Sequence, residues 1–181
     1  MDSDSIIIIL VISLLILLSA YFSSTETAFS SLNRIRVKNL VNLGNKRAKL
    51  VLKLSEDFDT VLSSILIGNN IVNIAAASLA TAIFVKYFRE SGVLLSTIFM
   101  TLIVLVFAEI SPKSLSKESP EKFAMFSAPL LKFFILIFTP LNFIFKKWKG
   151  FLSGIFNISH DKNITEEELI TIVEEAEHEG G

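Results

Sequence analysis

The sequence predicts an all-α membrane protein with three transmembrane helices. Of its 181 residues, 51% are hydrophobic and 19% are charged, whereas about a quarter of a water-soluble domain is charged. Charged residues are absent from three long stretches, which cover 5–25, 60–85 and 91–108. Each stretch is close to the length of about 20 apolar residues that a helix needs to cross a bilayer. This composition excludes a soluble globular enzyme and a disordered chain.

We expect the spans to cover about 5–31, 58–85 and 92–112, and the basic residues orient them. Lys and Arg concentrate in cytoplasmic loops. The N-terminus carries none, which favours a retained first span over a cleaved signal peptide. Seven lie between the first two spans: Arg34, Arg36, Lys38, Lys46, Arg47, Lys49 and Lys53. The predicted orientation therefore has the N-terminus outside, the first loop inside, the second loop outside, and all that follows the third span inside.

The first loop is expected to form a basic helical hairpin over 34–55. Apolar residues recur on both sides of Gly44-Asn45, a pair that typically ends a helix and makes a turn. Its cations fit two roles, since they can fix the topology or bind anionic lipid. Fixing the topology is the more common role.

A second apolar segment, over 123–148, is predicted to be a broken belt in the inner leaflet. Its longest uncharged run is only 133–145, and Pro129 and Pro140 are expected to break it. Lysines flank it on both sides, so a full crossing would place one cationic cluster outside. A fourth span is the alternative.

The chain is expected to divide into a transmembrane domain over 1–150 and a cytoplasmic region over 151–181. Thr165 and Glu168 form a capping box for an acidic helix, because 164–181 contains seven glutamates and no Lys or Arg. The end at Gly181 suggests the front part of a longer protein. His160 and His178 lie outside the spans without ligand spacing, so we interpret them as surface residues.

Polar residues inside the predicted spans indicate an ion site. Polar groups in a bilayer are costly unless they face protein, water or an ion. Ser19 and Ser23 are four residues apart in the first span, as are Asn69 and Asn73 in the second, so each pair shares a helix face. Glu109 follows 18 uncharged residues in the third span. Pro112 lacks the N–H that would bond the carbonyl of Ala108.

Together these groups supply only oxygen ligands, which favour hard cations such as Mg²⁺, Ca²⁺ or Na⁺. Cysteine is absent from the sequence, and we find no catalytic triad, phosphate loop or paired catalytic carboxylates, so no enzyme is predicted. Each residue alone also has an ordinary explanation. The serines can bond helix carbonyls, the asparagines can join helices, and Glu109 can pair with Lys113. Glu26 is expected to hold the hairpin through Arg34 or Arg36.

Three motifs resemble the transmembrane domain of the CorC/CNNM (cyclin-M) magnesium transporters. They are LSAYFSSTETAFSSLNRIR at 18–36, LIGNNIVNIAAA at 66–77 and FAEISPKSLS at 107–116. The tail TEEELITIVEEAEHEG resembles the start of the acidic linker that precedes the family's paired CBS domains, which are missing from this chain.

The resemblance implies a multi-pass protein of the cell membrane, a homodimer with three spans per protomer, and Mg²⁺ export driven by Na⁺ entry. It places the ion ligands on Ser23, Asn69, Asn73 and Glu109, with Ser19 beside them and a backbone oxygen near Glu109. We therefore expect a Mg²⁺ transporter domain with an inward-facing site. Alternatives are a membrane-anchored Mg²⁺ sensor or scaffold that regulates another transporter, and a passive channel.

Overall fold

The protein is entirely helical over residues 2–155, which are the residues described by a computed structural model. The prediction of an all-α chain is confirmed. The chain divides into two units, Met1–Asn142 and Phe143–Gly181, and each is considered by itself. In chain order the helices are α1 (Ser3–Ser30), α2 (Arg34–Asn42), α3 (Lys46–Glu56), α4 (Phe58–Phe88), η1 (Arg89–Ser91), α5 (Gly92–Ile103), η2 (Val104–Ile110), α6 (Ser111–Glu118), α7 (Pro120–Ile137) and α8 (Thr139–Ile155).

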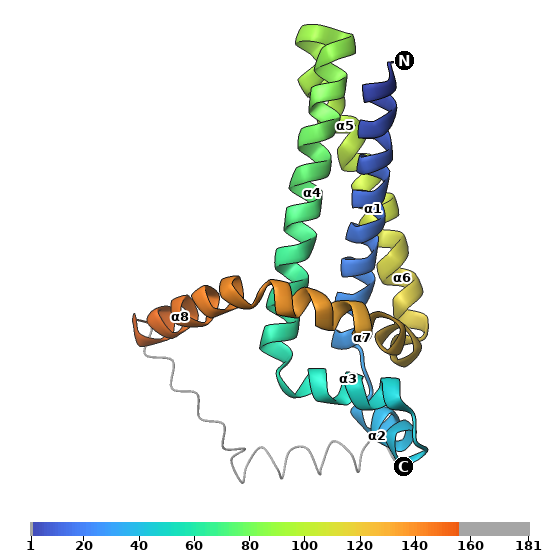
Figure 1. Cartoon of the computed structure of the whole chain (residues 1–181), viewed down its shortest axis with the longest axis vertical. Coiled ribbons are helices and arrows are strands. Elements are labelled where there is room, and N and C mark those ends of the chain that lie inside the picture. Colours follow the sequence, from blue (N-terminus) through green and yellow to red (C-terminus); the bar gives the residue numbers. More distant parts are fainter. Residues whose placement is uncertain (1, 156–181) are drawn as a thin grey trace, which may run out of the picture. The chain divides into compact units, whose positions relative to one another are not determined.

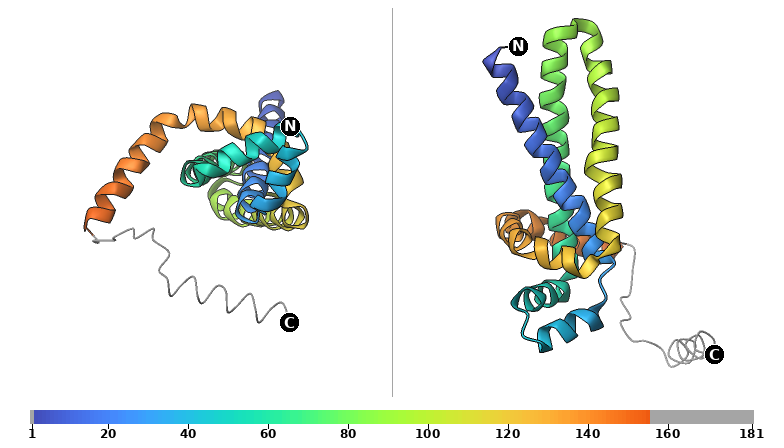
Figure 2. Two further views of the ribbon diagram at one scale, coloured as in Figure 1. Left: turned by 90° about the horizontal axis from the view of Figure 1, so that it is seen from below. Right: turned by 90° about the vertical axis from the view of Figure 1, so that its right-hand side faces the viewer.

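Three long helical legs form the bundle: α1, α4, and the continuous run α5–η2–α6 (Figure 1). The chain reverses at η1, so that α4 and α5 lie side by side and antiparallel (Figure 2). Arg89 takes a positive φ of 51° at this turn. A Cβ on Gly92 would lie 2.6 Å from the backbone of Val85. Only glycine therefore lets the two legs approach so closely at the reversal.

Long apolar helices give the chain two to three candidate membrane spans. Helices of sufficient length and hydropathy are found at Ser3–Ser30 and within Phe58–Glu118, a stretch that contains both antiparallel legs. The helices Pro120–Ile137 and Thr139–Trp148 form a further candidate span only when they are taken together as one bent segment. Many large side chains on α1 and α5 are exposed, as expected for surfaces that face lipid.

Near the end of α1, a second layer of helices packs across the bundle. The hairpin α2–α3 lies beside α7, and their facing side chains Val37, Val51 and Leu131 are fully buried in one apolar cluster (Figure 1). Asn33 and Asn45 cap the two hairpin helices through their side-chain oxygens. The basic hairpin that the sequence predicts over 34–55 is thus present.

The prolines of the second apolar segment act differently from the prediction. Pro129 lies inside α7 without ending it, because the helix is held on its other side by the buried Ala124, Ala128 and Leu131. Pro140 lies in the first turn of α8, where its missing N–H costs no helical bond. The break between the helices falls at Phe138 instead. The predicted acidic helix over 164–181 lies outside the described residues.

Candidate ion-binding site

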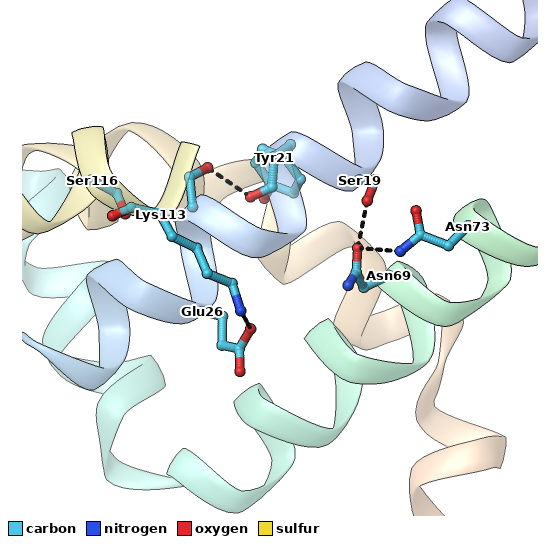
Figure 3. Close-up of polar contacts among 8 residues, drawn as sticks. Ser19, Tyr21, Glu26, Asn69, Asn73, Lys113 and Ser116 are labelled. Carbon is cyan, nitrogen blue, oxygen red and sulfur yellow. Dashed lines mark hydrogen bonds and ion pairs between the residues drawn. The ribbon is translucent and has the colours of Figure 1, made fainter. Parts of the chain in front are cut away.

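A hydrogen-bonded serine and asparagine join α1 to α4 in the middle of the bundle. Ser19 is fully buried and its Oγ donates to Asn69 Oδ1 at 2.8 Å. Asn73, one turn further along α4, donates its Nδ2 to the same oxygen at 3.4 Å (Figure 3). Ser19 therefore does not bond its own helix, and Asn69 accepts from both neighbours.

Close packing next to Asn69 fixes the separation of α1 and α4. The ring of Phe22, which is 1% exposed, lies against Gly68, where an added Cβ would be 2.3 Å from its Cζ. The ring is itself held by Tyr21 and Phe134, with centroid distances of 5.3 and 4.9 Å. Gly68 thus brings the backbone that carries Asn69 within reach of Ser19.

Asn73 and Glu109 line the same cavity, which has a volume of about 360 Å³ and lies against α4, α5 and η2. The Oδ1 of Asn73 is buried and has no hydrogen-bond partner. The Glu109 carboxylate is partly buried, and Lys113 does not pair with it. One cavity is thus lined by an acidic residue and by an asparagine whose amide oxygen has no partner.

A π-helix carries Glu109 and Ala108 into this region. It covers Val104–Ile110, and the N–H of Ser111 bonds the carbonyl of Val106, five residues back. Pro112 follows immediately and has no N–H to bond a carbonyl of that turn. Ala108 is fully buried. Such π-turns are rare and often lie at functional sites, and the sequence did not reveal this one.

Ser23 is fully buried, and its hydroxyl has no hydrogen-bond partner. The helices α1 and α4 are antiparallel (Figure 1). Ser23 therefore lies one turn from Ser19 in one direction along the bundle, and Asn73 lies one turn from Asn69 in the other direction. Ser23 and Asn73 therefore flank the Ser19–Asn69 bond on opposite sides, each about 6 Å along the axis.

An ion pair closes the same end of the bundle between α1 and α6. Lys113 Nζ lies 3.1 Å from Glu26 Oε2 (Figure 3). The expectation that Glu26 holds the hairpin through Arg34 or Arg36 is therefore wrong, since Arg34 instead donates to the carbonyl of Ser55 at 2.7 Å. The pairing of Glu109 with Lys113 is also not found, because Glu26 competes for the same ammonium.

Hydroxyl groups that sequence reasoning missed extend the cavity away from Glu109. Thr81 and Ser96 contact each other at 3.0 Å, and Thr97 and Thr101 lie on the same wall. The spacing of the polar residues could have indicated these hydroxyls. Asn69, Asn73 and Thr81 are four and eight residues apart on α4, and so are Thr97, Thr101 and Glu109 on the third leg. The described residues contain no group of three or more His, Cys, Asp and Glu side chains that could hold a metal ion. Any cation here would rely on one carboxylate and neutral oxygens.

Comparison with known proteins identifies relatives along nearly the whole chain. A UPF0053 protein of Haemophilus influenzae is 42% identical over 97% of this chain, and the UPF0053 inner membrane protein YfjD of Escherichia coli is 38% identical over 88%. A protein named polyamine export protein, also from Haemophilus influenzae, is 29% identical over 92%.

The matched region is only part of each relative. This chain spans 43% of the length of the first relative, 38% of the second and 42% of the third. The family model described as the cyclin M transmembrane N-terminal domain matches residues 9–181. The chain therefore belongs to the CNNM family of membrane domains.

Proposed function

We propose that the chain is the membrane domain of a secondary-active Mg²⁺ transporter. In this proposal six oxygens bind the ion: the side chains of Ser19, Ser23, Asn69, Asn73 and Glu109 and the backbone carbonyl of Ala108. Mg²⁺ prefers six oxygens in a near-octahedral arrangement at about 2.0–2.1 Å. One carboxylate among neutral ligands suits an ion that must bind and then leave.

The observation that carries the proposal is the cavity that Asn73 and Glu109 share. An unpartnered buried acceptor costs about 1–3 kcal/mol. Asn73 lines this cavity, and its Oδ1 has no donor. A cation in the cavity would satisfy that oxygen and the Glu109 carboxylate together. The unpartnered hydroxyl of Ser23 is a second oxygen of the same kind.

Binding would require a local exchange of partners. Asn69 Oδ1 already accepts from Ser19 and Asn73. A bound cation would replace these donors, since the Ser19 hydroxyl can rotate its proton away and the Asn73 amide can turn its oxygen inward. Ser23 lies on the far side of the Ser19–Asn69 bond from Asn73, so binding by the full ligand set would also require α1 and α4 to rearrange around the ion. A site that closes only when loaded suits alternating access.

The proposal includes a topology with three spans: α1, α4 and α5–η2–α6. The N-terminus lies outside the cell membrane, the α2–α3 hairpin inside, and the α7–α8 segment follows the inner leaflet without crossing. The site faces the cytoplasm, and two copies of the chain form a homodimer. Basic residues of the hairpin and small residues of α4 support these points.

Measurement of Mg²⁺ binding and flux tests the site. Glu109→Gln and Asn73→Ala should each abolish Mg²⁺ binding by the purified chain, measured by calorimetry, and Mg²⁺ uptake into proteoliposomes that contain a Mg²⁺-sensitive dye. The matched control is Asn70→Ala, because Asn70 is an exposed neighbour with the same side chain. Unchanged Mg²⁺ binding in both site variants would refute the proposed ligands.

Replacement of Na⁺ by another monovalent cation tests the energy source. Na⁺-coupled export predicts that the Mg²⁺ flux stops when the Na⁺ gradient is removed. Flux that continues without Na⁺, at much higher rates, identifies a passive channel. Binding with no flux in the full-length protein identifies a sensor that regulates another transporter.

A second candidate function is export of a polyamine, as the name of one relative states for that protein. The volume of the cavity favours it, because about 360 Å³ exceeds what a bare ion fills. From Asn73 to Thr81 the cavity follows α4 for about 12 Å, and its oxygens could accept hydrogen bonds from separated ammonium groups. Competition of putrescine with Mg²⁺ for binding, and lower putrescine flux in Glu109→Gln, would support this function.

A further inference from the structure

We propose that Glu26 is a positioning residue for the candidate ion site, because it holds the ammonium group of Lys113 away from the Glu109 carboxylate. Without Glu26, Lys113 would pair with Glu109 and compete with the transported cation. The inference rests on the proposed function, since it takes Glu109 as an ion ligand. It adds a residue that sets the affinity of the site without touching the ion.

Glu26 lies on the stripe of α1 that carries two of the candidate ligands. It follows Ser23 by three residues and Ser19 by seven, so the three side chains share one face of the helix. Ser19 and Ser23 are fully buried, whereas the side chain of Glu26 is 27% exposed. Glu26 therefore lies about one turn beyond Ser23, where the buried stripe reaches the surface of the bundle.

The side chain of Lys113 is within reach of two carboxylates. Its Nζ lies 3.1 Å from Glu26 Oε2 on the neighbouring helix (Figure 3). Glu109 precedes Lys113 by four residues on the same leg, and the Cβ atoms of side chains at this helical spacing are about 5–6 Å apart. The side chain of Lys113 is 40% exposed, so packing does not lock its rotamer. Rotation of this side chain can therefore exchange the ammonium between the two acids.

The backbone that carries Lys113 is held in place. Ser116 is fully buried, and its Oγ donates to the carbonyl of Lys113 at 3.1 Å. The leg packs against α1 both in α6 and in the π-helix that carries Glu109. Loss of Glu26 would therefore leave the ammonium beside Glu109 rather than release Lys113 from the bundle.

A lysine paired with Glu109 would act as an internal competitor. A group on a short tether has an effective concentration of about millimolar or more. Its attraction to Glu109 would be stronger than at an open surface, because the carboxylate is partly buried. Each incoming cation would first have to displace the ammonium. Glu26 prevents this competition by giving Lys113 a partner outside the proposed ligand set.

Calorimetric measurement of Mg²⁺ binding by variants of the purified chain tests the inference. Glu26→Gln should bind Mg²⁺ at least about fivefold more weakly, which is the lower end of typical coupling between two sites. Lys113→Met in the native background should leave the affinity close to native, because Glu26 already holds the ammonium aside. The same substitution added to Glu26→Gln should restore the native affinity, because the competitor is removed.

This cycle separates competition by Lys113 from a general effect of charge. If Glu26 contributed only its negative charge to the field around the site, Lys113→Met would raise the affinity by the same factor with and without Glu26. The effects of the two substitutions on the binding free energy would then be additive. Additivity would overturn the inference.

The matched controls are Glu118→Gln and Lys117→Met, which neutralise exposed charges of α6 and should bind Mg²⁺ as the native chain does. Thermal unfolding without Mg²⁺ shows that each variant remains folded. Native affinity in Glu26→Gln, together with lost binding in Glu109→Gln, would overturn this inference and leave the proposed function intact. Unchanged binding in Glu109→Gln would instead refute the proposed ligand, and this inference with it.

Discussion

Ser23 and Asn73 each bury an oxygen that has no hydrogen-bond partner. Such atoms are rare in folded proteins, and each needs a physical explanation such as a water, an ion or strain. Neighbouring hydroxyls differ, since Ser24 and Thr25 both donate to the carbonyl of Tyr21. At the scale of single residues, this contrast separates Ser24 and Thr25, which bond their own helix, from Ser23.

Ser23→Ala should leave the stability of the ion-free protein unchanged within about 0.5 kcal/mol, because no hydrogen bond is lost. Mg²⁺ should no longer raise its melting temperature, because a ligand stabilises only the state that binds it. Thermal unfolding with and without Mg²⁺ measures both effects. Ser24→Ala is the control and should lose about 1 kcal/mol of stability while keeping the Mg²⁺ response. A full Mg²⁺ response in Ser23→Ala would exclude Ser23 as a ligand.

Gly68→Ala should destabilise the protein by about 1–3 kcal/mol through overpacking. The new methyl group would meet the ring of Phe22, which Tyr21 and Phe134 prevent from moving aside. Gly150→Ala is the matched control, since nothing lies within 4 Å of its added Cβ. Unfolding in mixed detergent micelles compares the two variants. Equal stability of Gly68→Ala and the native chain would show that the ring is free to adjust.

At the scale of elements, polar ties join helices that are distant in the sequence. Tyr21 donates to the carbonyl of Ser127 at 2.9 Å, which joins α1 to α7. Asn142 donates to Ser64 Oγ at 2.7 Å, which joins the first turn of α8 to α4. These ties explain how α7 stays against the bundle although Pro129 interrupts its backbone hydrogen bonds.

The Asn142–Ser64 bond should give a coupling energy of about 1 kcal/mol in a double-mutant cycle with alanine at both positions. Both residues are buried, so water does not compete for this hydrogen bond. Unfolding free energies of the two single variants and the double variant measure it. Thr139→Ala, which removes an exposed bond to the carbonyl of Ile135, should change stability by less than about 0.5 kcal/mol. Simple additivity at Asn142 and Ser64 would contradict the predicted coupling.

At the scale of the whole molecule, the number of crossings decides which ends of the helices share a compartment. The leg α4 and the leg α5–η2–α6 reverse at η1, at the opposite end of the bundle from the α2–α3 hairpin (Figure 2). A three-span topology therefore separates η1 from the hairpin by the full bilayer.

Single cysteines can test this topology directly, because the 181 residues of this chain contain none. Ser91→Cys should react with a membrane-impermeant maleimide from outside, and Leu43→Cys only after the cells are opened. Lys147→Cys should behave like Leu43→Cys if the α7–α8 segment does not cross. Ala76→Cys is the buried control and should not react. Labelling of Lys147→Cys from outside would establish a fourth crossing.

The sequence alone was sufficient for the long apolar helices, the reversal between them and the basic hairpin. Each of these depends on local signals: uninterrupted apolar runs, the short gap between the second and third runs, and the Gly44-Asn45 pair at a turn. The predicted ends of the spans differ from the helices by a few residues, and the third leg continues to Glu118 because Pro112 does not interrupt it. Local signals therefore determined which segments are helical and which faces carry polar groups.

Only the tertiary structure decided which polar groups meet. Glu26 pairs with Lys113 across two helices, Ser19 bonds Asn69, and Glu109 enters the cavity of Asn73 by way of a π-helix. None of these contacts follows from spacing along one helix, because each depends on the rotation and depth of one helix against another. Those quantities are set by packing of side chains such as Phe22 on Gly68, which joins residues that are far apart in the sequence.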